Sequence, residues 1–231
     1  MGDSHELSGD VFRQLLMDVS NWFDERECIS MMKVLYRDHL KNTSKLFGAS
    51  KMIELLYMLC DSDNLAPNDL EILYDTINVT HQFAVQKEIK DKVTSCPDID
   101  DIRNTIISKF TTHRQKLIKL GLKMSKKQLE IVSGLYNNTK KDYTDNWDLI
   151  SDLEERNIIS EDMMETFMEK LKQNTCLKNL HAELNTIPVE PKLKRLHPPH
   201  TQEKLPQRKE MLFRQFCIPL LLRKVEFTLL T

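Results

Sequence analysis

Apolar side chains recur at intervals of three and four residues along the first part of the chain, which is the spacing of amphipathic helices. The clearest run is Val11, Leu15, Leu16, Val19 and Phe23. Short polar or glycine-containing stretches separate the runs, so each run should form its own short helix. Such a set of helices, one of them very short, would make a compact bundle. The predicted helices cover residues 11–23, 28–40, a turn or so within 42–50, 52–59, 70–80 and a segment from about residue 82.

Two residues predict how these helices begin. Asp10 precedes the first run and is placed to cap that helix with its carboxylate. Pro67 precedes the run over residues 70–80, and a proline in the first turn of a helix loses no hydrogen bond. We therefore expect Asp10 to be a helix cap and Pro67 to lie in a first turn.

The pattern occurs twice. A shift of 94 residues places Ile53-Glu54-Leu55-Leu56 on Trp147-Asp148-Leu149-Ile150, and a shift of 101 places Arg13-Gln14 on Arg114-Gln115. Since the shifts differ by seven, the second copy is seven residues shorter between its second helix and the Trp147 helix. We predict an all-α fold of two six-helix bundles in tandem, over residues 8–91 and 92–185.

The segment that joins the copies, residues 90–103, has one proline and no glycine. It carries apolar side chains such as Val93, Ile99 and Ile102, so it lacks the composition of a flexible linker. We therefore expect the bundles to pack rigidly through an apolar seam.

Composition supports a helical protein and marks a tail. Only 5 of the 231 residues are Gly and 8 are Pro, which disfavours folds with many short strands and turns. Six of the prolines follow residue 186, and residues 186–231 carry 9 basic and 4 acidic side chains in a chain of net charge −2. We predict that this proline-rich, basic tail is mostly disordered. The apolar stretch within residues 211–231 could dock on the bundles, touch a membrane or be a splice remnant.

Several classes of function are disfavoured. The five cysteines have no regular spacing, which favours reduced thiols in a cytoplasmic protein over disulfides, zinc or another bound cofactor. The start of the chain lacks a secretory signal, and no apolar stretch is long enough to be a transmembrane segment. Cys217 lies in a string that vaguely resembles a protease nucleophile segment, but the 46 residues after the second bundle are too few for a catalytic domain. We expect no enzyme activity.

Specific strings occur in both copies. The first copy contains Phe12-x-x-Leu15-Leu16-x-x-Val19-Ser20, Met32-Lys33-Val34-Leu35, Leu55-Leu56-x-x-Leu59 and Asn64-Leu65-Ala66-Pro67-Asn68-Asp69-Leu70. The second contains Trp147-x-Leu149-Ile150-x-x-Leu153 and Asn157-Ile158-Ile159-Ser160-Glu161-Asp162. Over residues 8–184 the chain resembles a pair of death effector domains, and a pair without an enzyme domain is similar to the FLICE-inhibitory proteins. The resemblance implies two six-helix death-fold bundles. It also implies an adaptor or inhibitor that binds other death effector domain proteins and regulates caspase-activating complexes in apoptotic or innate-immune signalling.

The resemblance also implies where a partner would bind. The family usually has an acid at the start of helix 2, here Glu27, and Arg-x-Asp-Leu early in helix 6, here replaced by Gln82-Phe83-Ala84-Val85. Val34 stands where the family exposes an apolar side chain, although it could instead lie at the edge of the core. We therefore predict an interaction surface on helix 2 of the first copy, formed by Glu27, Lys33, Val34 and Arg37.

Basic residues cluster on the first two predicted helices of the second copy, among them Arg114, Lys119 and Lys123. Without interleaved aromatic side chains, and in a slightly acidic chain, they do not indicate nucleic-acid binding. They form either a solvated face or a surface that meets the acidic first copy of another molecule by self-association. Two alternatives remain for the whole chain, a truncated initiator-caspase prodomain and a helical scaffold with no apoptotic role.

Overall fold

The structure, a computed structural model, describes residues 7–139 and 141–187. Within these residues the regular secondary structure is helical, apart from one bridge between Ala66 and Asp69. The described residues all belong to one compact unit of the chain. The predicted all-α fold class is therefore confirmed, whereas the predicted tail, residues 186–231, lies outside the described residues except for Thr186 and Ile187.

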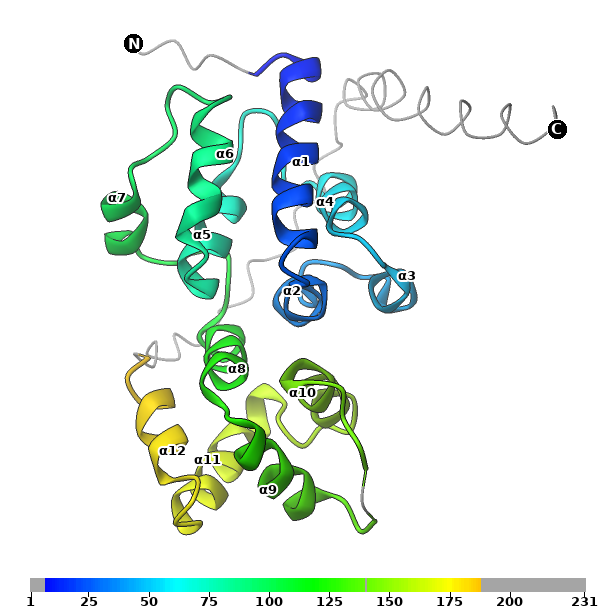
Figure 1. Cartoon of the computed structure of the whole chain (residues 1–231), viewed down its shortest axis with the longest axis vertical. Helices are drawn as coiled ribbons and strands as arrows, with labels where there is room; N and C mark the ends of the chain where they lie inside the picture. Colours follow the sequence, from blue (N-terminus) through cyan, green and yellow to red (C-terminus); the bar gives the residue numbers. More distant parts are fainter. Residues whose placement is uncertain (1–6, 140, 188–231) are drawn as a thin grey trace, which may run out of the picture. The chain divides into compact units, whose positions relative to one another are not determined.

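The first half contains six α-helices, and the last is preceded by a single 3-10 turn (Figure 1). Helix α1 packs on α4 and α6, and α2 packs on α4. Leu15, Leu56 and Leu59 are almost completely buried between them. The helices are α1 (Gly9–Asp24), α2 (Ile29–Tyr36), α3 (Thr43–Gly48), α4 (Met52–Asp61), α5 (Glu71–Thr80), η1 (Phe83–Val85) and α6 (Gln86–Lys90).

The second half begins with a short helix that packs back on α5 of the first half. It then repeats the arrangement of the first half, because α8 packs on α10 and α12 as α1 packs on α4 and α6. The helices are α7 (Ile99–Asn104), α8 (Thr112–Lys123), α9 (Lys126–Tyr136), α10 (Asn146–Glu155), η2 (Glu161–Met163), α11 (Met164–Gln173) and α12 (Lys178–Leu184).

The repeat extends to the backbone at the helix ends. Helices α4 and α10 begin and end 94 residues apart. Each is followed by a residue in the left-handed conformation, Asp63 (φ 57°) and Asn157 (φ 56°), which also lie 94 residues apart. Both turns close in the pattern of the Schellman motif. The closing bonds are Asn64 N–H to the Leu59 carbonyl (2.9 Å) and Ile158 N–H to the Leu153 carbonyl (2.8 Å).

The copies differ where the sequence predicts a shorter connection. In the first copy α3 lies between α2 and α4, whereas the described residues between α9 and α10 form no helix. The second copy brings its helices together directly. A side chain on Gly121 of α8 would place its Cβ 2.1 Å from the ring of Trp147 on α10, so the close approach of these helices requires glycine.

Both predictions about helix starts are wrong in detail. Helix α1 is capped by Ser8, whose hydroxyl accepts the Val11 N–H, and Asp10 already lies in the first turn, where it pairs with Arg13. Helix α5 begins at Glu71, too far along the chain for Pro67 to be in its first turn. Pro67 instead lies in a turn that the reciprocal backbone bonds of Ala66 and Asp69 close (3.1 and 3.0 Å).

The left-handed residues give a test of the repeat. A side chain with a Cβ is strained at φ near 57°, and glycine is not. We therefore expect Asp63→Gly and Asn157→Gly each to raise the free energy of unfolding, by roughly 0.5–1 kcal/mol, in urea denaturation. Asp61→Gly, inside the last turn of α4, is the control and should lower it by a similar amount. A loss of stability at both left-handed positions would contradict the shared cap geometry.

Candidate protein-interaction site

The two halves meet where α8 packs on α2 and α5, and where α10 packs on α2 (Figure 1). We call this contact the seam. Its centre is Arg114 on α8, whose side chain is only 2% exposed although it carries a full charge. A buried charge is tolerated only when it is paired and its donors are bonded, so the partners of Arg114 decide how the halves fit together.

The guanidinium of Arg114 binds three groups. It donates through Nε and Nη2 to both carboxylate oxygens of Asp38 in the first half (3.1 and 2.5 Å). Nη1 donates to the backbone carbonyl of Val34 on α2 (2.7 Å) and to Glu154 on α10 (3.0 Å). Burial opposes the charge, but the hydrogen bonds and charges of Asp38 and Glu154 outweigh it and raise the pKa of Arg114. The bidentate pair fixes the direction as well as the strength of the contact.

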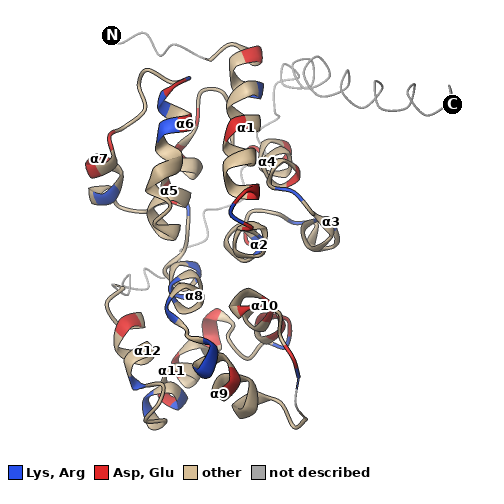
Figure 2. Cartoon of the chain, in the orientation of Figure 1, with Lys and Arg blue, Asp and Glu red and all other residues tan. Residues whose placement is uncertain are grey.

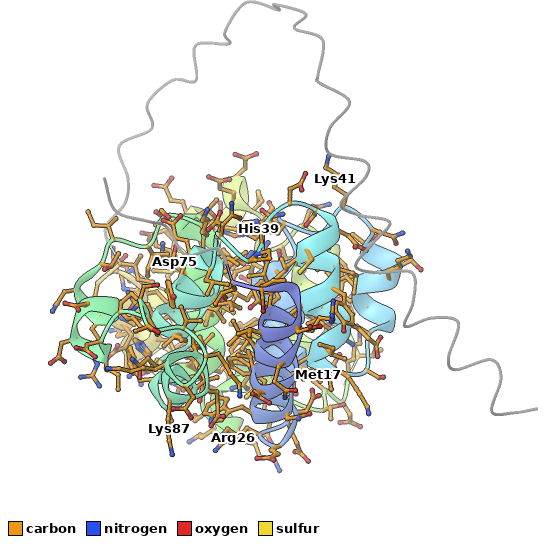
Figure 3. All side chains as sticks on the ribbon, turned by 90° about the horizontal axis from the view of Figure 1, so that it is seen from above. Met17, Arg26, His39, Lys41, Asp75 and Lys87 are labelled. Atoms are coloured by element: carbon orange, nitrogen blue, oxygen red, sulfur yellow. The ribbon has the colours of Figure 1, made fainter. Side chains whose placement is uncertain are left out.

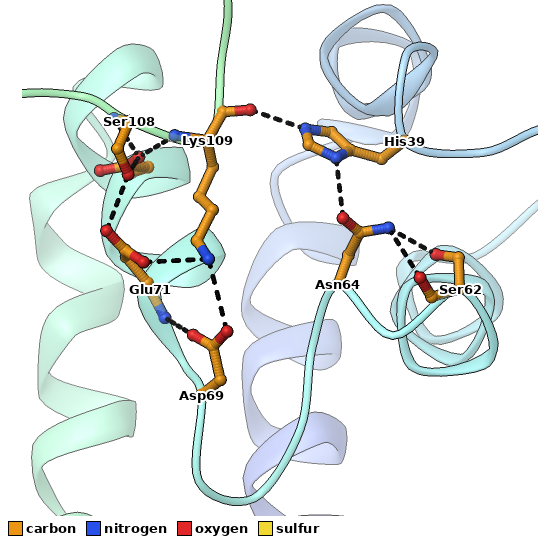
Figure 4. A network of polar contacts seen from close by, with 8 residues as sticks. His39, Ser62, Asn64, Asp69, Glu71, Ser108 and Lys109 are labelled. Atoms are coloured by element: carbon orange, nitrogen blue, oxygen red, sulfur yellow. Dashed lines mark hydrogen bonds and ion pairs between the residues drawn. The ribbon is translucent and has the colours of Figure 1, made fainter. Parts of the chain in front are cut away.

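A second polar network attaches the chain just before α8 to the first half (Figure 4). Asp75 on α5, only 3% exposed, accepts the backbone N–H groups of Ser108 and Lys109 (2.8 and 2.7 Å). The ammonium group of Lys109 contacts Glu71 (2.9 Å). The backbone carbonyl oxygen of Lys109 lies 2.9 Å from Nε2 of His39. These contacts determine where the backbone enters α8 and hence where Arg114 lies.

The expected apolar seam is therefore wrong at its centre, which is ionic. Apolar side chains do surround it, because Tyr36, Phe110 and Ile118 are buried and the rings of Tyr36 and Phe110 lie 6.1 Å apart. The sequence pattern shows which side of a helix is apolar, but it does not show which polar residue finds partners on the opposite half.

His113, next to Arg114, is the exception to this satisfied network. Its Nδ1 is buried and has no hydrogen-bond partner among the described residues. Burial, followed by the neighbouring charge of Arg114 and a smaller effect of Lys116, lowers the pKa of His113 to about 4, and Asp38 only partly opposes this. The ring is therefore neutral at physiological pH.

Three of the predicted interaction residues come together in the seam. Val34 is 2% exposed, so the expectation that it is an exposed contact is wrong, because α8 and α10 cover its helix. Arg114 is not on a basic surface, since its charge is used within the chain. Arg37 lies beside them, 3.6 Å from Glu154.

The other four predicted residues lie elsewhere. Glu27 is exposed in the turn between α1 and α2, with φ 53°. Lys33 donates to the Phe47 carbonyl at the end of α3 (2.8 Å), and burial lowers its pKa. Lys119 bonds Thr186 (2.5 Å) and lies 3.6 Å from Glu183, and Lys123 is exposed. None of the four takes part in the Arg114 network, and their proposed role in partner binding stays a prediction.

Sequence reasoning missed Asp38, Glu154, Asp75 and His39. One signal was available for Arg114, because it lies three residues before the core residue Leu117 and so falls on the apolar side of its helix. A charge at such a position implies a buried partner. No comparable signal identifies Asp38, which follows the end of α2 and keeps 45% of its side chain exposed.

Comparison with protein-family models gives no match, and comparison with curated protein sequences gives none either. In the part of the chain that the structure describes, no helix is both long and apolar enough to cross a membrane.

The seam predicts that removing the side chain of Arg114 lowers the stability of the chain strongly, whereas removing that of its counterpart Arg13 lowers it little. Arg114→Ala leaves Glu154 and the Val34 carbonyl without their main donor, so we expect the free energy of unfolding to fall by about 3 kcal/mol. Arg13→Ala, at the matching position of the first copy, removes an exposed ion pair and should cost less than about 1 kcal/mol. Urea denaturation of both variants measures the difference, and equal losses would contradict the burial of Arg114.

His113 predicts a pH dependence of stability. Its pKa is about 4 in the folded chain and near 6.5 when unfolded, so the unfolded state binds the proton more tightly. The stability that comes from the neutral ring is complete above pH 6.5 and is lost as the pH falls from 6.5 towards 4. His113→Gln should flatten the dependence of unfolding free energy on pH in this range. An unchanged slope in the variant would argue against the buried neutral ring.

Proposed function

We propose that this chain is a cytoplasmic, non-enzymatic adaptor or inhibitor that binds the death effector domains of other proteins. In this way it would regulate caspase-activating complexes in apoptotic or innate-immune signalling. The proposal starts from the resemblance of both copies to that family, and it is supported by the way in which the two copies use different faces.

The seam joins unlike faces of two similar bundles. The first copy contributes α2 and α5, which we call a receiving face, and the second contributes α8 and α10, which we call an arginine face. The repeat relates α2 and α5 to α9 and α11, so α9 and α11 form the receiving face of the second copy. It relates α8 and α10 to α1 and α4, so α1 and α4 form the arginine face of the first copy. In the part of the chain that the structure describes, a contact between unlike faces leaves one face of each kind open, and an open face can take a further bundle.

The single observation that carries the proposal is a contrast in burial at matching positions. Val34 on the covered receiving face is 2% exposed, whereas its counterpart Leu135 on α9 is 43% exposed. Ile118 on the covered arginine face is 0% exposed, whereas its counterpart Met17, marked on α1 in Figure 3, is 42% exposed. Large apolar side chains therefore occupy the open faces at the positions that become buried when bundles meet. Such residues are typical anchors of protein interfaces.

The test is binding of purified death effector domains, from an adaptor and from an initiator caspase, to the immobilised chain. Leu135→Asp or Met17→Asp should weaken binding at least tenfold, or about 1.4 kcal/mol, because a charge replaces an apolar anchor. Both variants should keep the melting temperature of the wild type, since both positions are exposed.

Two control variants separate binding from folding. Ile106→Asp changes an apolar residue that is 85% exposed and lies on neither face, so binding should be unaffected. Val34→Asp places a charge in the seam and should lower the melting temperature by several degrees. If neither death effector domain binds the wild-type chain, the proposed function is wrong.

A further inference from the structure

The open arginine face of the first copy carries an arginine that is equivalent to the centre of the seam. Under the shift of 101, Arg13 on α1 corresponds to Arg114 on α8, and the neighbouring core residue Leu16 corresponds to Leu117. The side chain of Arg13 is 36% exposed and pairs with Asp10, one turn earlier on its own helix. Arg13 therefore lies at the surface, whereas Arg114 at the matching position of the second copy is buried against the other half. Figure 2 shows charged residues of both signs along α1.

The carboxylates that hold Arg114 have no equivalent on the open faces. Asp38 corresponds to Thr139 after α9, and Glu154 corresponds to Cys60 on α4. If a second copy of this chain were added by repeating the seam, Arg13 would meet neither of the two acids that hold Arg114. Its ion-pair partner among the described residues is Asp10, which lies on the same helix and contributes nothing from across the contact. Burying an arginine without an opposing carboxylate is unfavourable.

On the basis of the proposed function, we infer that the Arg13 face binds a helical bundle of the same kind that supplies a carboxylate where Asp38 stands in this chain. A second copy of this chain is not such a partner, because Thr139 occupies that position. The arginine face of this chain is therefore not expected to bind the receiving face of a second copy by repeating the seam.

The chain itself can serve as the probe, once it is given the missing acid. Thr139 is exposed, so Thr139→Asp should fold normally and create the proposed partner surface. The double variant Thr139→Asp/Arg13→Gln then has the acid but lacks the arginine. Mixed with the wild-type chain, it should form a 1:1 complex in sedimentation velocity, at least tenfold tighter than the association of wild type with itself. The complex should weaken as salt is raised.

Matched variants assign the effect to the two residues. Thr94→Asp/Arg13→Gln adds the same charge at an exposed position outside both faces and should give no complex with the wild type. Thr139→Asp alone carries both groups and should form longer, concentration-dependent oligomers that Arg13→Gln disperses. Adding Cys60→Glu to Thr139→Asp restores the second carboxylate and should strengthen these oligomers further.

Two results would overturn the inference. One is wild-type self-association that Arg13→Gln disperses, because Arg13 would then bind a receiving face that has Thr139 in place of the carboxylate. The other is the absence of Arg13-dependent association in both Thr139→Asp and Thr139→Asp/Cys60→Glu. These outcomes are separate from failure of the proposed function, because the probe is the chain itself. Arg13-dependent association of Thr139→Asp, together with no binding of purified death effector domains, would reject only the proposed function.

Discussion

One buried charge holds the two halves in a single arrangement. Arg114 is enclosed by both halves, and its bonds to Asp38, the Val34 carbonyl and Glu154 leave little freedom in how α8 lies on α2. An apolar contact alone would tolerate small rotations and shifts, whereas a bidentate ion pair in a buried site tolerates few. The Asp75 network then holds the backbone that leads into α8, so the position of Arg114 and the path of the chain support each other.

The same helical unit occurs twice, but the same surface is covered in one copy and exposed in the other. Helix α2 of the first copy is covered, and its Val34 belongs to the interior of the chain. The corresponding Leu135 of the second copy remains at the surface. The α2 surface of the first copy is thus used inside the chain.

Much of the fold could be predicted from the sequence. The three- and four-residue spacing located the helices, and the shift of 94 residues anticipated the matching bounds of α4 and α10. Helix starts were less predictable, because several polar residues near a start compete for the cap. Ser8 caps α1 although Asp10 is an equally suitable residue type, and the difference is a matter of local backbone geometry.

The sequence by itself determined the helical units, their duplication and the side that each helix turns to its own core, since these depend on local spacing of apolar residues. Only the tertiary structure decided which outer faces meet. Val34 and Arg114 are 80 residues apart, and nothing in the spacing around either residue indicates the other. Their burial results from the packing of α2 against α8, a contact between distant segments whose partners become apparent only when both bundles are folded and placed together.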